Sequence, residues 1–192
     1  MATDNKNNNT QSTKVITGLV RFSYCHVFKP ESVGETDEPK YSVSLIIPKS
    51  DTETIRKIKA AIEIAKENGK SSKFGGKVPA GCKTPLRDGD VDREDDEAYA
   101  DSYFVNCSSL QKPGIIDAAK NEITDETKFY SGCYGRASIT FFAFNANGNK
   151  GIAAGLNNLQ KLRDGEPLGG RQSAEADFDD DFIDDDGDDS DF

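Results

Sequence analysis

Two segments near the N-terminus are rich in apolar, β-branched and aromatic residues and predict paired strands. The run from Val15 to Phe28, VITGLVRFSYCHVF, is interrupted only by Gly18 and predicts one long strand with a bulge or bend at the glycine. In residues 40–49, KYSVSLIIPK, apolar and serine side chains alternate, which is the two-residue period of a half-buried strand. We expect the two segments to pair as an antiparallel hairpin.

A helical period follows directly. Ser50 is expected to be the N-cap, with Glu53 three residues later completing a capping box, and Gly69 is expected to end the helix. The apolar residues between them recur at helical spacing and are Ile55, Ile58, Ile62 and Ala65. The segment therefore predicts one helix that packs on the sheet.

The last strands are the clearest. Residues 136–143 alternate between an apolar set, which is Ala137, Ile139, Phe141 and Ala143, and a second set, which is Arg136, Ser138, Thr140 and Phe142. Asn147-Gly148 is a hairpin turn signal, because both residues tolerate positive φ, and residues 151–162 are expected to return as the partner strand. With further strands expected at Tyr103–Cys107 and Ile115–Ile116, the pattern predicts a mainly β protein, a small β-barrel with one capping α-helix.

Charge divides the chain of 192 residues more sharply than its net charge of -10 suggests. Residues 172–192 hold 11 acids and no Lys or Arg, whereas residues 1–171 hold 23 acids and 24 bases. So dense a block of like charge repels itself and buries too little apolar surface to order. We therefore expect a disordered polar arm at residues 1–13, one folded domain at residues 14–171 and a disordered acidic tail at residues 172–192.

Charge also alternates inside the domain. Residues 70–87 contain several Lys and Arg, no acid and several Gly and Pro, which predicts a basic, mobile loop. Residues 88–101 hold eight acids and one Arg and predict a solvated acidic loop lying against the basic helix and loop before it. The sequence shows no secretory leader and no run of about 18 apolar residues, so a soluble cytoplasmic protein without a membrane partner is expected.

Signs of enzymatic chemistry are weak. The one histidine, His26, lies in a predicted strand, and residues 76–84 only approach a phosphate-binding loop, because Cys82 separates Gly81 from Lys83. The four cysteines form no Cys-x-x-Cys pair and are expected to be free thiols, mostly in the core; they are Cys25, Cys82, Cys107 and Cys133. We predict no catalytic residue, no metal and no cofactor.

Basic residues interleaved with aromatic ones point instead to single-stranded nucleic acid, since cations follow phosphates and aromatic rings stack on unpaired bases. The candidate DNA-binding residues are Lys73, Phe74, Lys77, Lys83, Arg87, Tyr99, Tyr103, Tyr130, Tyr134, Arg136 and Lys150. The acidic tail would compete with DNA for the same cationic groove. Its candidate partner-binding residues are Phe178, Phe182, Asp191 and Phe192.

An acidic end that closes on phenylalanine resembles bacterial single-strand-binding proteins and the acidic-tailed single-stranded DNA-binding proteins of phages. Residues 130–171 more specifically resemble a phage family of such proteins with an OB-fold, first catalogued as a domain of unknown function. The most specific stretches are Gly148-Asn149-Lys150-Gly151 and Gly155-Leu156-Asn157-Asn158, and the likeness covers residues 14–171.

The resemblance implies an OB-fold-like barrel and a non-enzymatic protein that binds single strands without sequence preference. It also implies a role in phage DNA replication and recombination and recruitment of replication proteins through the tail. We further expect a cytoplasmic location in the infected bacterial host and a monomer or weak dimer. Two alternatives stay open: a metal-dependent nuclease that uses the acids of residues 88–101, and an acidic mimic of DNA that inhibits another protein.

Overall fold

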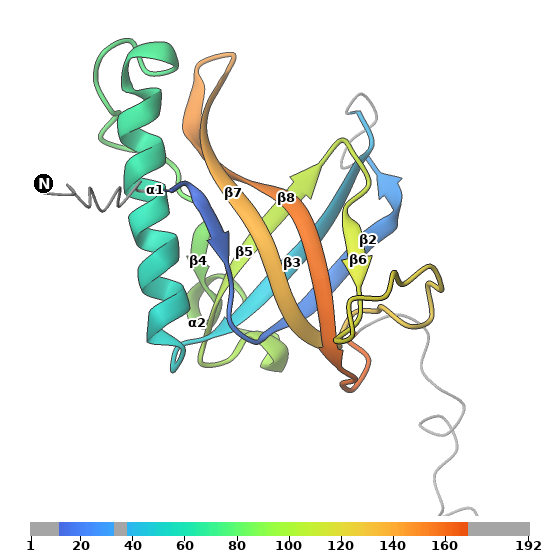
Figure 1. The fold of residues 1–192 in the computed structure, drawn as a ribbon. Helices are drawn as coiled ribbons and strands as arrows, with labels where there is room; N and C mark the ends of the chain where they lie inside the picture. Colours follow the sequence, from blue (N-terminus) through green and yellow to red (C-terminus); the bar gives the residue numbers. More distant parts are fainter. Residues whose placement is uncertain (1–11, 33–37, 169–192) are drawn as a thin grey trace, which may run out of the picture.

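The computed structural model describes residues 12–32 and 38–168, and within them it is mainly β (Figure 1). The chain runs through the elements β1 (Lys14–Ile16), β2 (Val20–Glu31), β3 (Lys40–Pro48), α1 (Thr52–Ser72), β4 (Leu86–Asp88), α2 (Gly89–Asp92), the 3₁₀ turn η1 (Glu97–Tyr99), β5 (Ser102–Ser109), β6 (Gly114–Ile116), β7 (Tyr134–Ala146) and β8 (Asn149–Arg163). The predicted arm, apart from its last two residues, and the predicted tail lie outside the described residues.

The strands close into a ring. Pairing runs from β7 to β2, β3, β5 and β8 and back to β7, with β1, β4 and β6 added at the edges of β7, β5 and β8. Two contacts that close the ring are short: β2 meets β7 only at Val20 and Arg21, and β5 meets β8, in parallel, only at Cys107 and Ser108. The predicted OB-like fold is confirmed, as a ring of strands closed by these short contacts.

The inside of the ring is apolar, and α1 covers one side of it (Figure 1). The helix contributes buried side chains at helical spacing, which are Ile55, Ile58, Ala61, Ile62 and Ala65. The predicted antiparallel pairs β2–β3 and β7–β8 are both present, and so are the strands predicted at residues 103–107 and 115–116.

The ends of the helix differ from the prediction. Asp51, not Ser50, is the N-cap: its carboxylate accepts hydrogen bonds from the Thr54 backbone N–H (3.1 Å) and from the Thr54 hydroxyl (2.6 Å). Glu53 pairs instead with Arg56 on the exposed face. Gly69 does not end the helix, which continues for almost one more turn, to Ser72.

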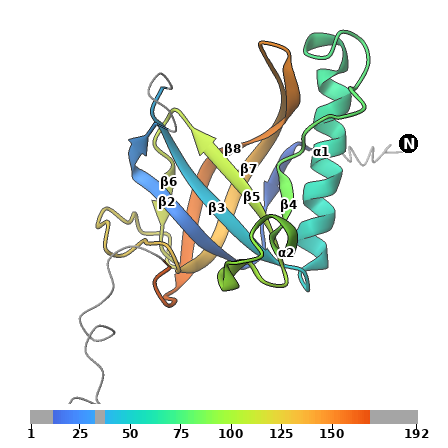
Figure 2. The ribbon, with the colours of Figure 1, turned by 180° about the vertical axis from the view of Figure 1, so that it is seen from behind.

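Two further expectations are corrected. The stretch from Val15 to Phe28 forms two strands, β1 and β2, which residues 17–19 separate; the hydroxyl oxygen and N–H of Thr17 bond the backbone of Ala137 on β7 instead of continuing the strand pairing. Residues 88–101 are not a simple solvated loop, since α2 and η1 fold onto the outer face of β3 and β5 (Figure 2). Tyr99 fills this second, smaller apolar cluster.

All four cysteines are free thiols, as predicted. Cys107 and Cys133 are buried, and burial raises the pKa of the Cys25 thiol to about 12. Within the described ranges, no helix combines the length and the apolar character that crossing a membrane requires.

Gly69 lies at a close approach of α1 to β7. A Cβ added there would be 2.2 Å from the Cβ of Ala143. Gly→Ala in a helix interior normally stabilises by about 1 kcal/mol, but overpacking a close contact costs about 1–3 kcal/mol. We therefore expect Gly69→Ala to lower the free energy of unfolding by about 1–2 kcal/mol in urea denaturation.

The exposed neighbour provides the control, because Asn68→Ala is expected to leave stability unchanged or slightly higher. Adding Ala143→Gly to Gly69→Ala should restore much of the loss, since the second change removes the clashing methyl group. A Gly69→Ala protein as stable as the parent would show that α1 and β7 are not held at this distance.

Candidate nucleic-acid interface

Acidic residues are absent from two long stretches of a chain that has 34 of them. Residues 68–87 contain five Lys or Arg and no Asp or Glu, and residues 134–163, which hold β7 and β8, contain four Lys or Arg and no acid. The two stretches meet where the loop after α1 lies beside the tip of the β7–β8 hairpin (Figures 1 and 2). Basic residues from both stretches therefore lie near one another at this place.

Backbone and side-chain hydrogen bonds join the loop to the hairpin. The Ile152 N–H donates to the Lys83 carbonyl oxygen at 2.8 Å, and the Asn145 side-chain amide donates to the Lys73 carbonyl oxygen at 3.2 Å. The Lys83 ammonium group also reaches the Asn149 side chain at 3.3 Å. Tertiary contacts thus position the loop that the sequence predicted to be mobile.

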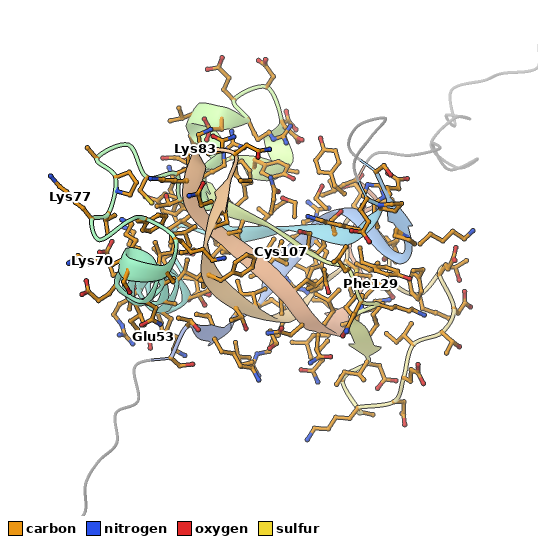
Figure 3. The ribbon with its side chains drawn as sticks, turned by 90° about the horizontal axis from the view of Figure 1, so that it is seen from above. Glu53, Lys70, Lys77, Lys83, Cys107 and Phe129 are labelled. Carbon is orange, nitrogen blue, oxygen red and sulfur yellow. The ribbon has the colours of Figure 1, made fainter. Side chains whose placement is uncertain are left out.

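We call Lys73, Lys77, Lys83 and Lys150 the basic tip. The first three are exposed and Lys150 is partly exposed. Figure 3 shows Lys77 projecting away from the loop and Lys83 lying by the hairpin. These four predicted DNA-binding residues are brought together by the fold.

Phe74 is a correction. Its ring is only 4% exposed and lies 3.4 Å from the position of a Cβ on Gly69, and its N–H donates to the Gly69 carbonyl oxygen. A ring buried in the core is not available to stack on a base. Phe74 instead anchors the basic loop to the end of α1.

Two aromatic residues that the candidate set omitted lie on the outer face of the hairpin. Phe142 is 48% exposed, and Phe144 is two positions further along the same strand and partly exposed. Their rings lean over glycines of β8: a Cβ on Gly155 would be 3.4 Å from the Phe142 ring and one on Gly151 would be 3.0 Å from the Phe144 ring. The alternation in residues 136–143 already placed Phe142 in the set opposite the apolar residues, so the signal was present in the sequence.

The outer face continues from β8 toward β2 as a row of three small residues that ends at a histidine. Gly155 pairs with Ser108, Ser108 with Ser42, and Ser42 with His26, so these four residues lie side by side across β8, β5, β3 and β2. All four are partly exposed. We call them the small-residue row; Phe142 borders it at the β7 end.

The aromatic residues predicted around residues 99–104 do not join the basic tip. Tyr99 is fully buried and its hydroxyl donates to the Ser44 hydroxyl at 3.1 Å, so its proposed stacking role is wrong; burial raises the pKa of this phenol. Tyr103 is partly buried, with the Lys49 and Lys59 ammonium groups 5.3 and 5.8 Å from its ring centre. Arg87 is exposed but is paired with Asp92 at 3.0 Å.

The acids of residues 88–101 are used in local ion pairs. Lys49 contacts Asp88 at 2.9 Å and Asp90 at 2.7 Å, and its hydrogen bond lowers the pKa of Asp90. In the part of the chain that the structure describes, no three His, Cys, Asp or Glu side chains gather into a group able to hold a metal ion. Among these residues there is therefore no such group to hold the metal ion that the nuclease alternative requires.

Tyr130, Tyr134 and Arg136 lie at the other end of β7. The Tyr130 hydroxyl bonds Asp164 and Gly165 at 3.0 Å each, and burial raises its pKa. The Tyr134 ring lies 4.5 Å from the Arg163 guanidinium and 5.3 Å from that of Arg21, while Arg136 bonds the Thr17 carbonyl oxygen at 2.9 Å. These three residues are therefore not brought to the basic tip.

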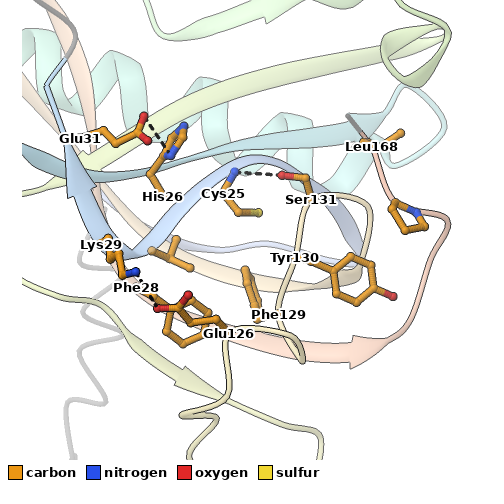
Figure 4. Close-up of a pocket in the computed structure, with 12 residues that line it drawn as sticks. Cys25, His26, Phe28, Lys29, Glu31, Glu126, Phe129, Tyr130, Ser131 and Leu168 are labelled. Atoms are coloured by element: carbon orange, nitrogen blue, oxygen red, sulfur yellow. Dashed lines mark hydrogen bonds and ion pairs between the residues drawn. The ribbon is translucent and has the colours of Figure 1, made fainter. Parts of the chain in front are cut away.

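The two tyrosines help to hold the segment that leads toward the C-terminus. Arg21 donates to the Glu166 carbonyl oxygen, and the Leu168 N–H donates to the Ser131 carbonyl oxygen. Figure 4 shows Tyr130 and Leu168 at the rim of a pocket against β2, with Cys25 and His26. The four candidate tail residues, Phe178, Phe182, Asp191 and Phe192, lie outside the described residues.

Residues 13–190 match the protein family described as "Enterobacter phage Enc34, ssDNA-binding protein". Protein p50 of the Acyrthosiphon pisum secondary endosymbiont phage 1 is 33% identical over 178 residues, which is 87% of this chain and 93% of that protein.

Among solved structures, the single-stranded DNA-binding protein of bacteriophage Enc34 in complex with ssDNA superposes with a TM-score of 0.73 at 28% identity, covering 82% of this chain and 90% of that one. The single-stranded DNA-binding protein gp2.5 of bacteriophage T7 shares the fold alone, with a TM-score of 0.58 at 14% identity over 88% of this chain and 97% of that one.

The predicted non-enzymatic character agrees with this family, and the predicted resemblance is confirmed. The family match covers nearly the whole chain, and a relative above 30% identity spans most of it. The chain therefore belongs to the family of phage single-stranded DNA-binding proteins represented by the Enterobacter phage Enc34 protein.

Proposed function

We propose that this protein binds single-stranded DNA without reading its sequence, and that the strand lies on the basic tip and the adjoining outer face of β7 and β8. The observation that carries the proposal is the meeting of two acid-free stretches beside two outward-facing phenylalanine rings. Cations there follow the phosphates, and the rings accept unpaired bases on their faces. No base edge is read, so binding tolerates any sequence.

The local geometry suits an extended strand. Gly151 and Gly155 leave the surface of β8 low, so the rings of Phe142 and Phe144 lie close to the sheet and offer their outer faces. The basic tip stands at the end of the same hairpin. The solved complex of the related Enc34 protein with ssDNA supports a DNA-binding role for this fold.

We further propose that the protein protects single strands during phage DNA replication and recombination in the cytoplasm of the bacterial host, as a monomer or weak dimer. Residues 172–192 would compete with DNA for the basic tip and would recruit replication and recombination proteins. Their 11 acids, with Phe178, Phe182 and the terminal Phe192, supply the charge and the apolar anchors for those two roles.

Single strands should be preferred over duplex, because only unpaired bases expose faces for stacking. The test measures affinity for single-stranded and duplex DNA of equal length at several stated salt concentrations. Changing Lys73, Lys77 and Lys83 to Ala should weaken single-strand binding and flatten the slope of log affinity against log salt by up to about 2, since each phosphate contact contributes roughly 0.7.

A matched triple variant controls for the loss of three charges. Lys57, Lys120 and Lys128 are exposed and lie outside the basic tip, so changing them to Ala should leave most of the affinity and the slope in place. Equal affinity for the two forms of DNA would contradict the stacking proposal. No binding even after removal of the tail would favour the acidic-mimic alternative, and magnesium-dependent cleavage would favour the nuclease.

Substitutions of Phe142 and Phe74 should have different effects, because the first should weaken DNA binding and the second should lower the stability of the fold. Phe142→Ala removes a half-exposed ring and should weaken single-strand binding by about 1–3 kcal/mol with the salt slope retained, while stability stays within about 0.5 kcal/mol. Phe74→Ala removes a buried ring and should lower the free energy of unfolding by about 3–5 kcal/mol. Titration with ssDNA and urea denaturation of both variants test this, and a loss of stability in Phe142→Ala equal to that in Phe74→Ala would contradict it.

Deleting residues 172–192 changes the formal charge from -10 to -10 + 11 = +1. We expect tighter DNA binding, most at low salt, because screening weakens a charged competitor once the Debye length falls to roughly 10 Å. Removing Phe192 alone keeps every acidic side chain and should leave DNA affinity unchanged. If the long deletion has no effect on affinity at low salt, the tail does not compete.

A further inference from the structure

Tyr24 has an unusual backbone conformation for its residue type. Its φ is 48°, in the left-handed region that a tyrosine side chain disfavours, and it lies within β2 and not in a turn. The pairing of β2 with β3 shifts register between Ser23 and His26, on either side of it. Such outliers persist only where the surrounding structure imposes them, and they cluster at functional sites.

The bulge has a clear effect on the side chain, because bulges re-aim the residues that they carry. Tyr24 is 51% exposed, whereas Phe22 and Val27 on the same strand are buried. The ring borders a pocket of about 310 Å³ that His26, Asp96 and Leu168 also line. The strand therefore departs from regular pairing and presents an aromatic face to solvent.

Arg93 lies against this ring. Its guanidinium carbon is 5.4 Å from the centre of Tyr24 and 5.7 Å from the centres of Tyr99 and Phe104. Arg93 is the single base among the eight acids of residues 88–101. Among the described residues Asp88 and Asp90 pair with Lys49 and Asp92 pairs with Arg87, whereas Arg93 forms no ion pair.

Tyr24 and Phe142 border the same surface from opposite ends. The small-residue row runs from Gly155 on β8 to His26 on β2, two residues from Tyr24, and Phe142 leans over Gly155 at its other end. Four strand spacings separate β7 from β2 along this path through β8, β5 and β3, which is about 19 Å. The row itself contains no acidic residue, although the His26 ring lies 3.2 Å from the Glu31 carboxylate.

We infer that Tyr24 is a second base-stacking residue and that Arg93 is the cation beside it, so that a single strand crosses the small-residue row from Phe142 to Tyr24. The inference rests on the proposed single-strand binding. It also gives the acidic segment a role, which is to place one unpaired arginine beside a strained tyrosine. Tyr99 and Phe104 hold Arg93 in place, and its guanidinium forms no ion pair with an acid among the described residues, so it can contact a phosphate.

The test uses the full chain and three substitutions at these two positions. Tyr24→Gly suits the observed φ while removing the ring, so it should fold at least as stably as the parent and lose roughly 5- to 100-fold in affinity for a single-stranded oligothymidine. Tyr24→Phe keeps the ring and should bind within about twofold of the parent. Arg93→Gln should weaken binding and reduce its salt slope by up to about 0.7.

Val91→Ala is the matched control, because Val91 is 69% exposed and lies two residues from Arg93; it should bind like the parent. A parent-like affinity in Tyr24→Gly would overturn the inference, and so would an equal loss in Tyr24→Phe, which would indicate a role of the hydroxyl group. If the parent protein itself fails to bind the oligonucleotide, the proposed function is wrong. If only the lysine and Phe142 variants lose affinity, the proposed function is supported and Tyr24 is not a stacking residue.

Discussion

The close approach of α1 to β7 at Gly69 and Ala143 determines where the charged loop lies. Because Gly69 has no side chain, the last turn of the helix lies directly on the strand, and Phe74 folds into the core beside it. The loop after the helix is then placed along the hairpin, where the Lys83 carbonyl oxygen accepts from Ile152. A helix held further away would separate the lysines of the loop from the hairpin and its rings.

Acidic and basic residues are grouped in separate segments of the chain, and the fold places these segments on different elements. The eight acids of residues 88–101 gather on α2, η1 and their connections, where three of them are paired with Lys49 and Arg87. The strands that face the proposed strand path, β7 and β8, contain none. The partial pairing of acids in one segment and the exclusion of acids from β7 and β8 thus separate the acidic segment from the proposed DNA surface.

The sequence predicted most of the fold because its signals were local. The alternation in residues 136–143 and the Asn147-Gly148 turn are sufficient for the β7–β8 hairpin, and the period from Ile55 to Ala65 is sufficient for α1. The misplaced residues depend on contacts far apart in the chain. Phe74 and Tyr99 occur among charged residues, as exposed rings would, yet both are buried by tertiary packing that no local period reveals. The outward direction of Tyr24 likewise depends on a bulge, which a two-residue period does not predict.

The β7–β8 hairpin also places the basic tip and the segment that leads toward the C-terminus at opposite ends of the domain. β8 begins beside the basic tip and carries the chain through 15 residues toward the opposite end of the domain, where Tyr130, Arg21 and Ser131 fasten the segment ending at Leu168 (Figures 1 and 2). The 24 residues that follow reach at most about 80 Å even when fully extended. The contact proposed between them and the basic tip of the same molecule would close a loop across the domain, and its effective concentration would depend on linker length. Shortening residues 169–176 would therefore change the proposed competition without altering a single contact at the DNA surface.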